Sequence, residues 1–109
     1  MRHIPTCIDN DISAYKIFMV SSRTCPHCQR VKDALNQHNI NRNLMKIIEI
    51  DSDCRRDEIM QHVEHLSGSR TVPKVWINGN LIGGADDILR ENSSGNLRQL
   101  LLSAGALYS

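Results

Sequence analysis

The sequence has few aromatic residues and almost no excess of charge. Its 109 residues include one Phe, one Trp and two Tyr, and the formal net charge is +1. Proteins that bind nucleic acids usually present a strongly basic surface or aromatic rings on which bases stack. We therefore expect no nucleic-acid partner.

Long apolar runs are also lacking. No stretch approaches the roughly 18 apolar residues that span a membrane, and the N-terminal residues lack the apolar segment of a secretory signal. Asp9 and Asp11 are unusual for a transit peptide. We expect a cytoplasmic protein with no membrane partner. Length and a 40% apolar composition suit a single domain over residues 1–109, which we expect to be a monomer.

The first third of the chain predicts a helix, a strand and a second helix. Residues 4–15 place apolar side chains four apart, which indicates an amphipathic helix. Residues 16–21 form a short apolar run typical of a buried strand. A helix should begin at Pro26, since proline suits the first helical position, and should extend to about Asn39.

The middle of the chain predicts a strand followed by a helix. Residues 44–50 are mainly apolar and indicate a second strand. Ser52 and Asp53 are good caps for a helix that extends to Leu66. Apolar residues recur along this helix and should form its inner side: Ile59, Val63 and Leu66.

The last third predicts a hairpin and two helices. Asn78-Gly79 separates the apolar runs 74–77 and 80–82, which is the strongest short signal for a β-hairpin. A short helix should begin near Asp86 and break at residues 92–95. The final helix has an apolar stripe made by Leu97, Leu100, Leu101 and Ala104.

The order of these elements predicts the fold. A strand–helix–strand unit requires a parallel, right-handed crossover, and the hairpin adds antiparallel strands to the same sheet. We therefore predict an α/β protein with a thioredoxin-like three-layer fold, in which helices flank a central mixed four-stranded sheet.

Cys25 and Cys28 frame Pro26 and His27 where the first predicted strand passes into a helix. A sulfur at a helix N-terminus faces unpaired N–H groups and the positive end of the helix dipole, and both stabilise a thiolate. Such sites lower the pKa of cysteine from about 8.5 to between about 3.5 and 7.5. We predict that Cys25 is the nucleophile and that Cys28, one turn later, is the resolving thiol.

The residues between and around the two thiols bear on their chemistry. Pro26 stiffens the first turn of the helix, and a partly protonated His27 imidazole would favour the thiolate. Alternatively, His27 is a solvated side chain without such an effect. A zinc ribbon needs a second close cysteine pair, and Cys7 and Cys54 do not form one, so we predict no metal site.

Two other segments can hold a peptide-like ligand. Because proline cannot donate to a sheet, Thr71-Val72-Pro73 leaves the main chain of Val72 free to pair with an extended peptide; the alternative is an ordinary edge-strand proline. Gly83-Gly84-Ala85-Asp86-Asp87 opens a helix whose N–H groups suit a carboxylate. Asp86 or Asp87 can hold an ammonium group, although a capped helix start would look the same.

These motifs together resemble the glutaredoxin family. The resemblance rests on Cys25-Pro26-His27-Cys28, Arg70-Thr71-Val72-Pro73 and residues 76–87, which occur in the family's order. It extends from about residue 10 to the C-terminus. Thioredoxins usually carry Trp-Cys-Gly-Pro-Cys, whereas Thr24 stands here in place of the tryptophan.

The resemblance implies a binding site for glutathione. It implies a cis Val72–Pro73 bond, glutathione along Val72, and its γ-glutamyl end at Ala85 and Asp86. Many family members have a lysine three residues before the first cysteine, where this chain has Ser22 followed by Arg23. The residues implied to bind glutathione are Arg23, Arg70, Thr71, Val72, Pro73, Gly84, Ala85, Asp86 and Asp87.

The resemblance also implies the activity. The chain should be a glutathione-dependent thiol–disulfide oxidoreductase that reduces protein disulfides and glutathione mixed disulfides, with glutathione as its co-substrate and no metal or flavin. Its partners should be glutathionylated or disulfide-containing proteins and, indirectly, glutathione reductase with NADPH. The alternatives are a thioredoxin-like dithiol oxidant and a glutaredoxin that bridges a 2Fe–2S cluster between two chains.

The remaining polar and sulfur-containing residues are expected to have no role in the chemistry. Cys7 should pack as a small apolar residue, and Cys54 should lie unreactive in the first turn of the helix that follows residue 52. The alternatives are that this helix position and the neighbouring Arg55 and Arg56 raise the reactivity of Cys54, and that either cysteine forms a regulatory disulfide. Lys74 should face solvent. The same applies to the scattered histidines His38, His62 and His65.

Overall fold

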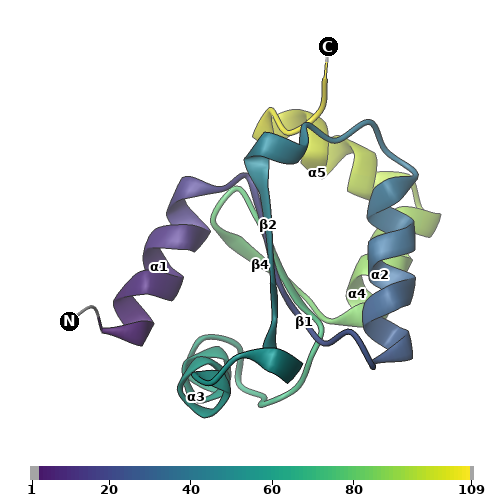
Figure 1. Ribbon diagram of the computed structural model, residues 1–109. Helices are drawn as coiled ribbons and strands as arrows, with labels where there is room; N and C mark the ends of the chain where they lie inside the picture. Colours follow the sequence, from purple (N-terminus) through teal and green to yellow (C-terminus); the bar gives the residue numbers. More distant parts are fainter. Residues whose placement is uncertain (1–2, 109) are drawn as a thin grey trace.

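Four strands of the computed structural model form one mixed sheet in the order β2-β1-β3-β4 (Figure 1). The structure describes residues 3–108. β1 (Ile17–Ser21) runs parallel to β2 (Met45–Glu49) and antiparallel to β3 (Lys74–Ile77), and β4 (Asn80–Gly83) completes the hairpin. The predicted α/β fold with a mixed four-stranded sheet is therefore confirmed.

Helices cover both faces of the sheet and make the outer two of three layers (Figure 1). On one face lie α1 (Ile4–Ala14) and α3 (Arg56–Ser67). The other face carries α2 (Pro26–Asn36), α4 (Ala85–Ser93) and α5 (Asn96–Ala104). Within residues 3–108, no helix has the length and apolar character needed to cross a bilayer.

The central strand β1 contributes to the core on both faces of the sheet. Ile17 and Met19 pack with the helices α2, α4 and α5, whereas Phe18 and Val20 pack with α1 and α3. The Phe18 ring lies 5.7 Å from the Trp76 ring, centroid to centroid. Burial on both faces explains why this strand is a continuous apolar run in the sequence.

The predicted hairpin forms between β3 and β4. Asn78 and Gly79 have φ values of 52° and 80°, which is the left-handed conformation that a type I′ turn requires at both central positions. Asparagine and glycine are the residues that adopt it at least cost, so this turn follows directly from local sequence.

Two helix ends differ from the prediction. α2 ends at Asn36 rather than Asn39, because the N–H groups of Gln37 and His38 bond to the carbonyls of Ala34 and Leu35 in tighter, 3₁₀-type turns. Its last predicted residues therefore lie outside the helix.

The helix α3 begins at Arg56 and not directly after Ser52 and Asp53. The Asp53 carboxylate instead accepts the Arg55 N–H at 2.9 Å, within the turn that precedes the helix. Cys54 lies exposed in that turn, so its predicted place in the first helical turn is wrong. Leu66, expected on the inner side of the helix, is 37% exposed.

Two charged or polar residues that were expected at the surface are buried. Lys74 is only 6% exposed, and its Nζ donates to the carbonyl oxygen and to the Oγ1 of Thr71 at 3.0 and 2.6 Å. His62 is 9% exposed, and its Nε2 lies 2.8 Å from Asp9 Oδ1, which joins α3 to α1. His65 is exposed as predicted.

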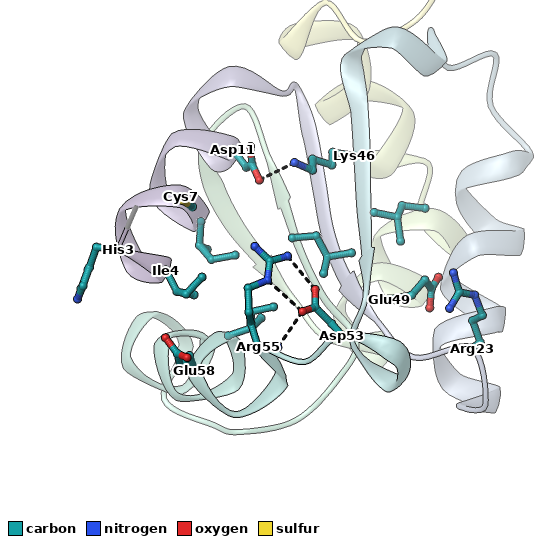
Figure 2. Close-up of a pocket in the computed structure, with 14 residues that line it drawn as sticks. His3, Ile4, Cys7, Asp11, Arg23, Lys46, Glu49, Asp53, Arg55 and Glu58 are labelled. Carbon is teal, nitrogen blue, oxygen red and sulfur yellow. Dashed lines mark hydrogen bonds and ion pairs between the residues drawn. The ribbon is translucent and has the colours of Figure 1, made fainter. Parts of the chain in front are cut away.

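A cavity of about 870 Å³ lies between α1, β2 and α3 (Figure 2). Charged residues around it pair with one another: Lys46 Nζ lies 2.9 Å from Asp11 Oδ2, and Arg55 donates to both carboxylate oxygens of Asp53. Cys7 is among its lining residues. The first pair connects the edge strand β2 to α1, and the second lies within the turn before α3.

Replacing a buried leucine of α5 should destabilise the protein, whereas its exposed neighbour should not. Leu101 is fully buried and Leu102 is 46% exposed. We expect Leu101→Ala to lower the free energy of unfolding by about 2–5 kcal/mol, because it leaves a cavity in the core. Leu102→Ala should change it by less than about 0.5 kcal/mol. Urea denaturation followed by circular dichroism measures both, and equal losses would contradict this packing.

Candidate active site

The strand register brings three loops to the same edge of the sheet. Val20, near the end of β1, lies opposite Lys74, the first residue of β3. Val75 lies opposite Gly83, the last residue of β4. The loop that holds Cys25, the segment before β3 and the start of α4 therefore meet at one end of the molecule.

Cys25 is the N-cap residue of α2, and its side chain is half-buried. Its Sγ accepts a hydrogen bond from the Cys28 N–H, with the two atoms 3.4 Å apart. Burial alone would raise the pKa of this thiol, but hydrogen bonds from Cys28 and from the His27 N–H, together with the positive charge of Lys32, outweigh burial and lower it. The site therefore favours the Cys25 thiolate.

Cys28 lies one turn further along α2 and is fully buried. Its Sγ accepts a hydrogen bond from the Ser22 N–H at 3.4 Å. Burial raises the pKa of the Cys28 thiol, and the neighbouring Cys25 sulfur raises it further. The two thiols of one motif thus have opposite tendencies to ionise, as the predicted division of roles requires.

Pro26 occupies the first position of α2, as predicted. The His27 side chain is exposed, and its proposed effect on the thiols stays a prediction. Sequence reasoning overlooked Lys32, the cation that acts on Cys25. Its spacing of seven residues from Cys25 was the available signal, because residues seven apart lie on one face of a helix.

The segment before β3 has an open main chain. The Val72–Pro73 bond is cis, as the family resemblance implies. Pro73 is buried, Val72 is half-buried and Thr71 is exposed. The Nζ of the buried Lys74 donates a hydrogen bond to the Thr71 carbonyl oxygen. Within residues 3–108, the N–H and C=O groups of Val72 form no hydrogen bond with another protein group. They are therefore free to pair with a ligand.

The start of α4 lies against that segment. A Cβ atom on Gly84 would be 3.4 Å from the Pro73 carbonyl oxygen, which is an ordinary contact distance, so the two segments lie side by side. Asp87 accepts from the Arg90 guanidinium at 2.8 Å and from the Gly84 N–H at 3.1 Å, and these bonds lower its pKa. Asp87 thus caps its own helix, and the exposed Asp86 is the better placed of the two for an ammonium group.

The predicted glutathione-binding residues fall into neighbouring cavities. Arg70, Thr71 and Val72 line one of about 530 Å³ together with Arg56, which sequence reasoning did not single out. Another cavity, of about 410 Å³, is lined by Lys74 and by the start of α4, comprising Gly84, Ala85, Asp86 and Asp87.

Arg23 lies apart from these two cavities. Its Nη1 donates to Ser52 Oγ at 2.9 Å, and its N–H donates to Asp51 Oδ1 at 3.3 Å. The side chain therefore points to the 3₁₀ helix Ile50–Ser52. In the part of the chain that the structure describes, no three His, Cys, Asp or Glu side chains are grouped to hold a metal ion.

Comparison with known proteins identifies the family. The glutaredoxin family model matches residues 16–82. The chain belongs to the glutaredoxin family. It is 38% identical to glutaredoxin-C1 of Arabidopsis thaliana over 96 residues, which are 88% of this chain and 74% of that protein. As a glutaredoxin, it has the role of a thiol–disulfide oxidoreductase.

Solved glutaredoxin structures have the same fold. Oxidised glutaredoxin 2 of Chlamydomonas reinhardtii superposes with a TM-score of 0.88 at 34% identity, over 95% of each chain. A buckwheat glutaredoxin–glutathione complex superposes with a TM-score of 0.88 at 28% identity, over 96% of this chain and 93% of the other.

The two active-site thiols should react at different rates with an alkylating reagent. At pH 7 we expect iodoacetamide to modify Cys25 well before Cys28, because the thiolate is the reacting species and the pKa is lowered at Cys25 and raised at Cys28. Mass spectrometry of the reduced protein, sampled over time, measures both. Earlier modification of Cys28 would mean that the roles are reversed.

Proposed function

We propose that this glutaredoxin uses glutathione to reduce protein disulfides and glutathione mixed disulfides. The observation that carries the proposal is the N-cap position of Cys25 at the sheet edge where the free main chain of Val72 also lies. The buckwheat relative in complex with glutathione supports this choice of ligand.

The chemistry of glutathione fits the groups at this edge. Its extended backbone can pair with the N–H and C=O of Val72, as a peptide pairs with a strand. The carboxylate of its glycine end suits the guanidinium groups of Arg70 and Arg56. The γ-glutamyl end also has a carboxylate, which suits the N–H groups that begin α4, and an ammonium group, which suits Asp86.

For a glutathionylated protein, the reaction uses Cys25 alone. The Cys25 thiolate attacks the sulfur of the bound glutathione, so a Cys25–glutathione disulfide forms and the protein sulfur leaves as a thiolate that takes up a proton. A second glutathione loses its thiol proton and attacks the glutathione sulfur of this disulfide. Oxidised glutathione leaves, and Cys25 is again a thiolate.

For a protein disulfide, the reaction also needs Cys28. Cys25 attacks one sulfur of the substrate, forms a mixed disulfide and releases the other sulfur. Cys28 then loses its proton and attacks Cys25, which releases the reduced substrate and leaves a Cys25–Cys28 disulfide. Two glutathione molecules reduce this bond, and glutathione reductase with NADPH would regenerate them in the cytoplasm.

Serine variants should separate the two reactions. We expect Cys25→Ser to abolish both, since it removes the attacking sulfur. Cys28→Ser should retain turnover of a glutathionylated peptide and lose most reduction of a protein disulfide. A coupled assay with glutathione reductase and NADPH measures each, and activity in Cys25→Ser would refute the proposed nucleophile.

Removing one negative charge at the start of α4 should weaken substrate binding. We expect Asp86→Asn to raise the KM for a glutathionylated peptide about fivefold with little change in kcat, because the ammonium group loses its ionic partner at a cost of about 1 kcal/mol. Glu64→Gln, an exposed charge on α3, is the matched control and should leave the KM unchanged. A KM equal to wild type in Asp86→Asn would exclude this contact.

A further inference from the structure

A largely buried ion pair lies between α2 and the end of β2. Lys32 Nζ is 2.5 Å from Glu49 Oε1, and the two side chains are only 19% and 15% exposed. Burying such a pair is costly, and apolar residues of similar volume often give equal or greater stability. Its position beside the active site therefore suggests a role beyond stability.

Lys32 lies on the same face of α2 as the reactive thiol. Cys25 is the N-cap residue of α2, and Lys32 lies seven residues later, about 10 Å along the helix axis. Because side chains on a helix lean toward its N-terminus, we expect the charge at the end of the lysine stem to lie nearer to Cys25 than its Cα atom does. The positive charge of Lys32 lowers the pKa of Cys25, as described above.

Glu49 is placed to hold this lysine. It is the last residue of β2 and pairs in register with Ser21, the last residue of β1. Met45 and Ile47, four and two residues earlier, pack against the core beneath α2, so the alternation of the strand directs Glu49 to the same face. Within the described residues, its Oε2 is buried without a hydrogen-bond partner, and Lys32 is its ionic partner.

Other charged groups at this end of the sheet bond to neighbours or are exposed to solvent. His27, on α2 itself, is exposed, and so are Asp86 and Arg56. Four other charged side chains bond to neighbours: Arg23 to Ser52, Arg70 to Asp57, Lys74 to Thr71, and Asp87 to Arg90. Lys32 is thus the half-buried cation that α2 itself supplies near its N-cap sulfur.

We propose that Lys32 promotes the ionisation of Cys25 and that Glu49 is the positioning residue that holds Lys32 in place. This inference deepens the proposed function, since it rests on Cys25 as the nucleophile. It assigns the electrostatic effect to a half-buried lysine rather than to the exposed imidazole of His27.

The first test measures how the alkylation rate of Cys25 depends on pH. Lys32→Met keeps the length of the side chain and removes its charge. Below the midpoint of the pH profile, we expect alkylation about threefold slower, because the thiolate fraction falls more than its nucleophilicity rises. At high pH, where the thiol is fully ionised, the rate should equal or exceed that of wild type. A merely structural defect would not produce this crossing.

Lys46→Met is the matched control for this test. Lys46 also pairs with a carboxylate, Asp11, at 2.9 Å, but it projects from β2 toward α1 on the other face of the sheet (Figure 2). Its pH profile should coincide with that of wild type. A Lys32→Met profile with the wild-type midpoint would overturn the proposal. Lys32→Met can fail to fold because Glu49 is left unpaired. In that case the double variant Lys32→Met/Glu49→Gln is compared with the single variant Glu49→Gln, and the difference between their pH profiles gives the same test.

A second test separates the position of Lys32 from the charge of Glu49. Glu49→Ala removes the ionic contact with Lys32, so Lys32 can turn to solvent. The midpoint of the pH profile for Cys25 alkylation should then rise toward that of Lys32→Met. Glu49→Gln keeps an oxygen that accepts from Lys32, so its midpoint should not rise. A Glu49→Ala midpoint at or below that of wild type would overturn the positioning role.

These tests do not depend on glutathione. Alkylation is followed by mass spectrometry of the peptide that contains Cys25 and Cys28, and fragmentation of this peptide assigns the modification to one thiol or the other. Cys7 and Cys54 lie in other peptides. If the proposed function fails, glutathione-dependent turnover is absent while the alkylation profiles differ as stated. If the role of Lys32 is wrong but the proposed function is right, glutathione-dependent turnover is present and the alkylation profiles of Lys32→Met and wild type coincide.

Discussion

The central strand β1 pairs with β2 along one edge and with β3 along the other, and all five of its residues are buried. Its side chains alternate between the two cores, so a shift by one residue would exchange the contents of both. Cys25 follows only four residues after the end of this strand. The position of the thiol relative to Val72 and to α4 is therefore a consequence of the register of the sheet.

Within that frame, the reactivity of Cys25 is a balance between burial and local polar groups. Partial burial excludes water and opposes ionisation, but it also strengthens each hydrogen bond and each charge that acts on the sulfur. At the N-cap, the N–H groups of the first turn have no helical partner and point to the sulfur. Cys28 lies inside the helix, where burial prevails, and this difference of one turn shifts the pKa values of the two thiols in opposite directions.

Local signals predicted much of the fold, because the structures that they specify are local. Asn78-Gly79 determines its turn by backbone conformation alone, and the β1 run needs burial on both faces. The errors concern residues whose surroundings come from elsewhere. His62 is buried because Asp9, 53 residues earlier, lies on the helix packed against it. Lys74 is buried because the loop folds the Thr71 carbonyl and hydroxyl over its ammonium group. Neither contact follows from periodicity.

The candidate site was predictable to the same extent. The opposite pKa shifts of Cys25 and Cys28 follow from one strand–helix junction, whereas the contact of Lys32 with Glu49 comes from the edge strand that packs beside α2. Cys54 shows why nearby cations and a nearby helix do not suffice. It adjoins Arg55 and Arg56, yet it precedes the N-cap residue and lies exposed in a turn, so the N–H groups of α3 do not converge on its sulfur. What distinguishes Cys25 is its place at the N-cap itself, a position that the sheet register and Pro26 impose together.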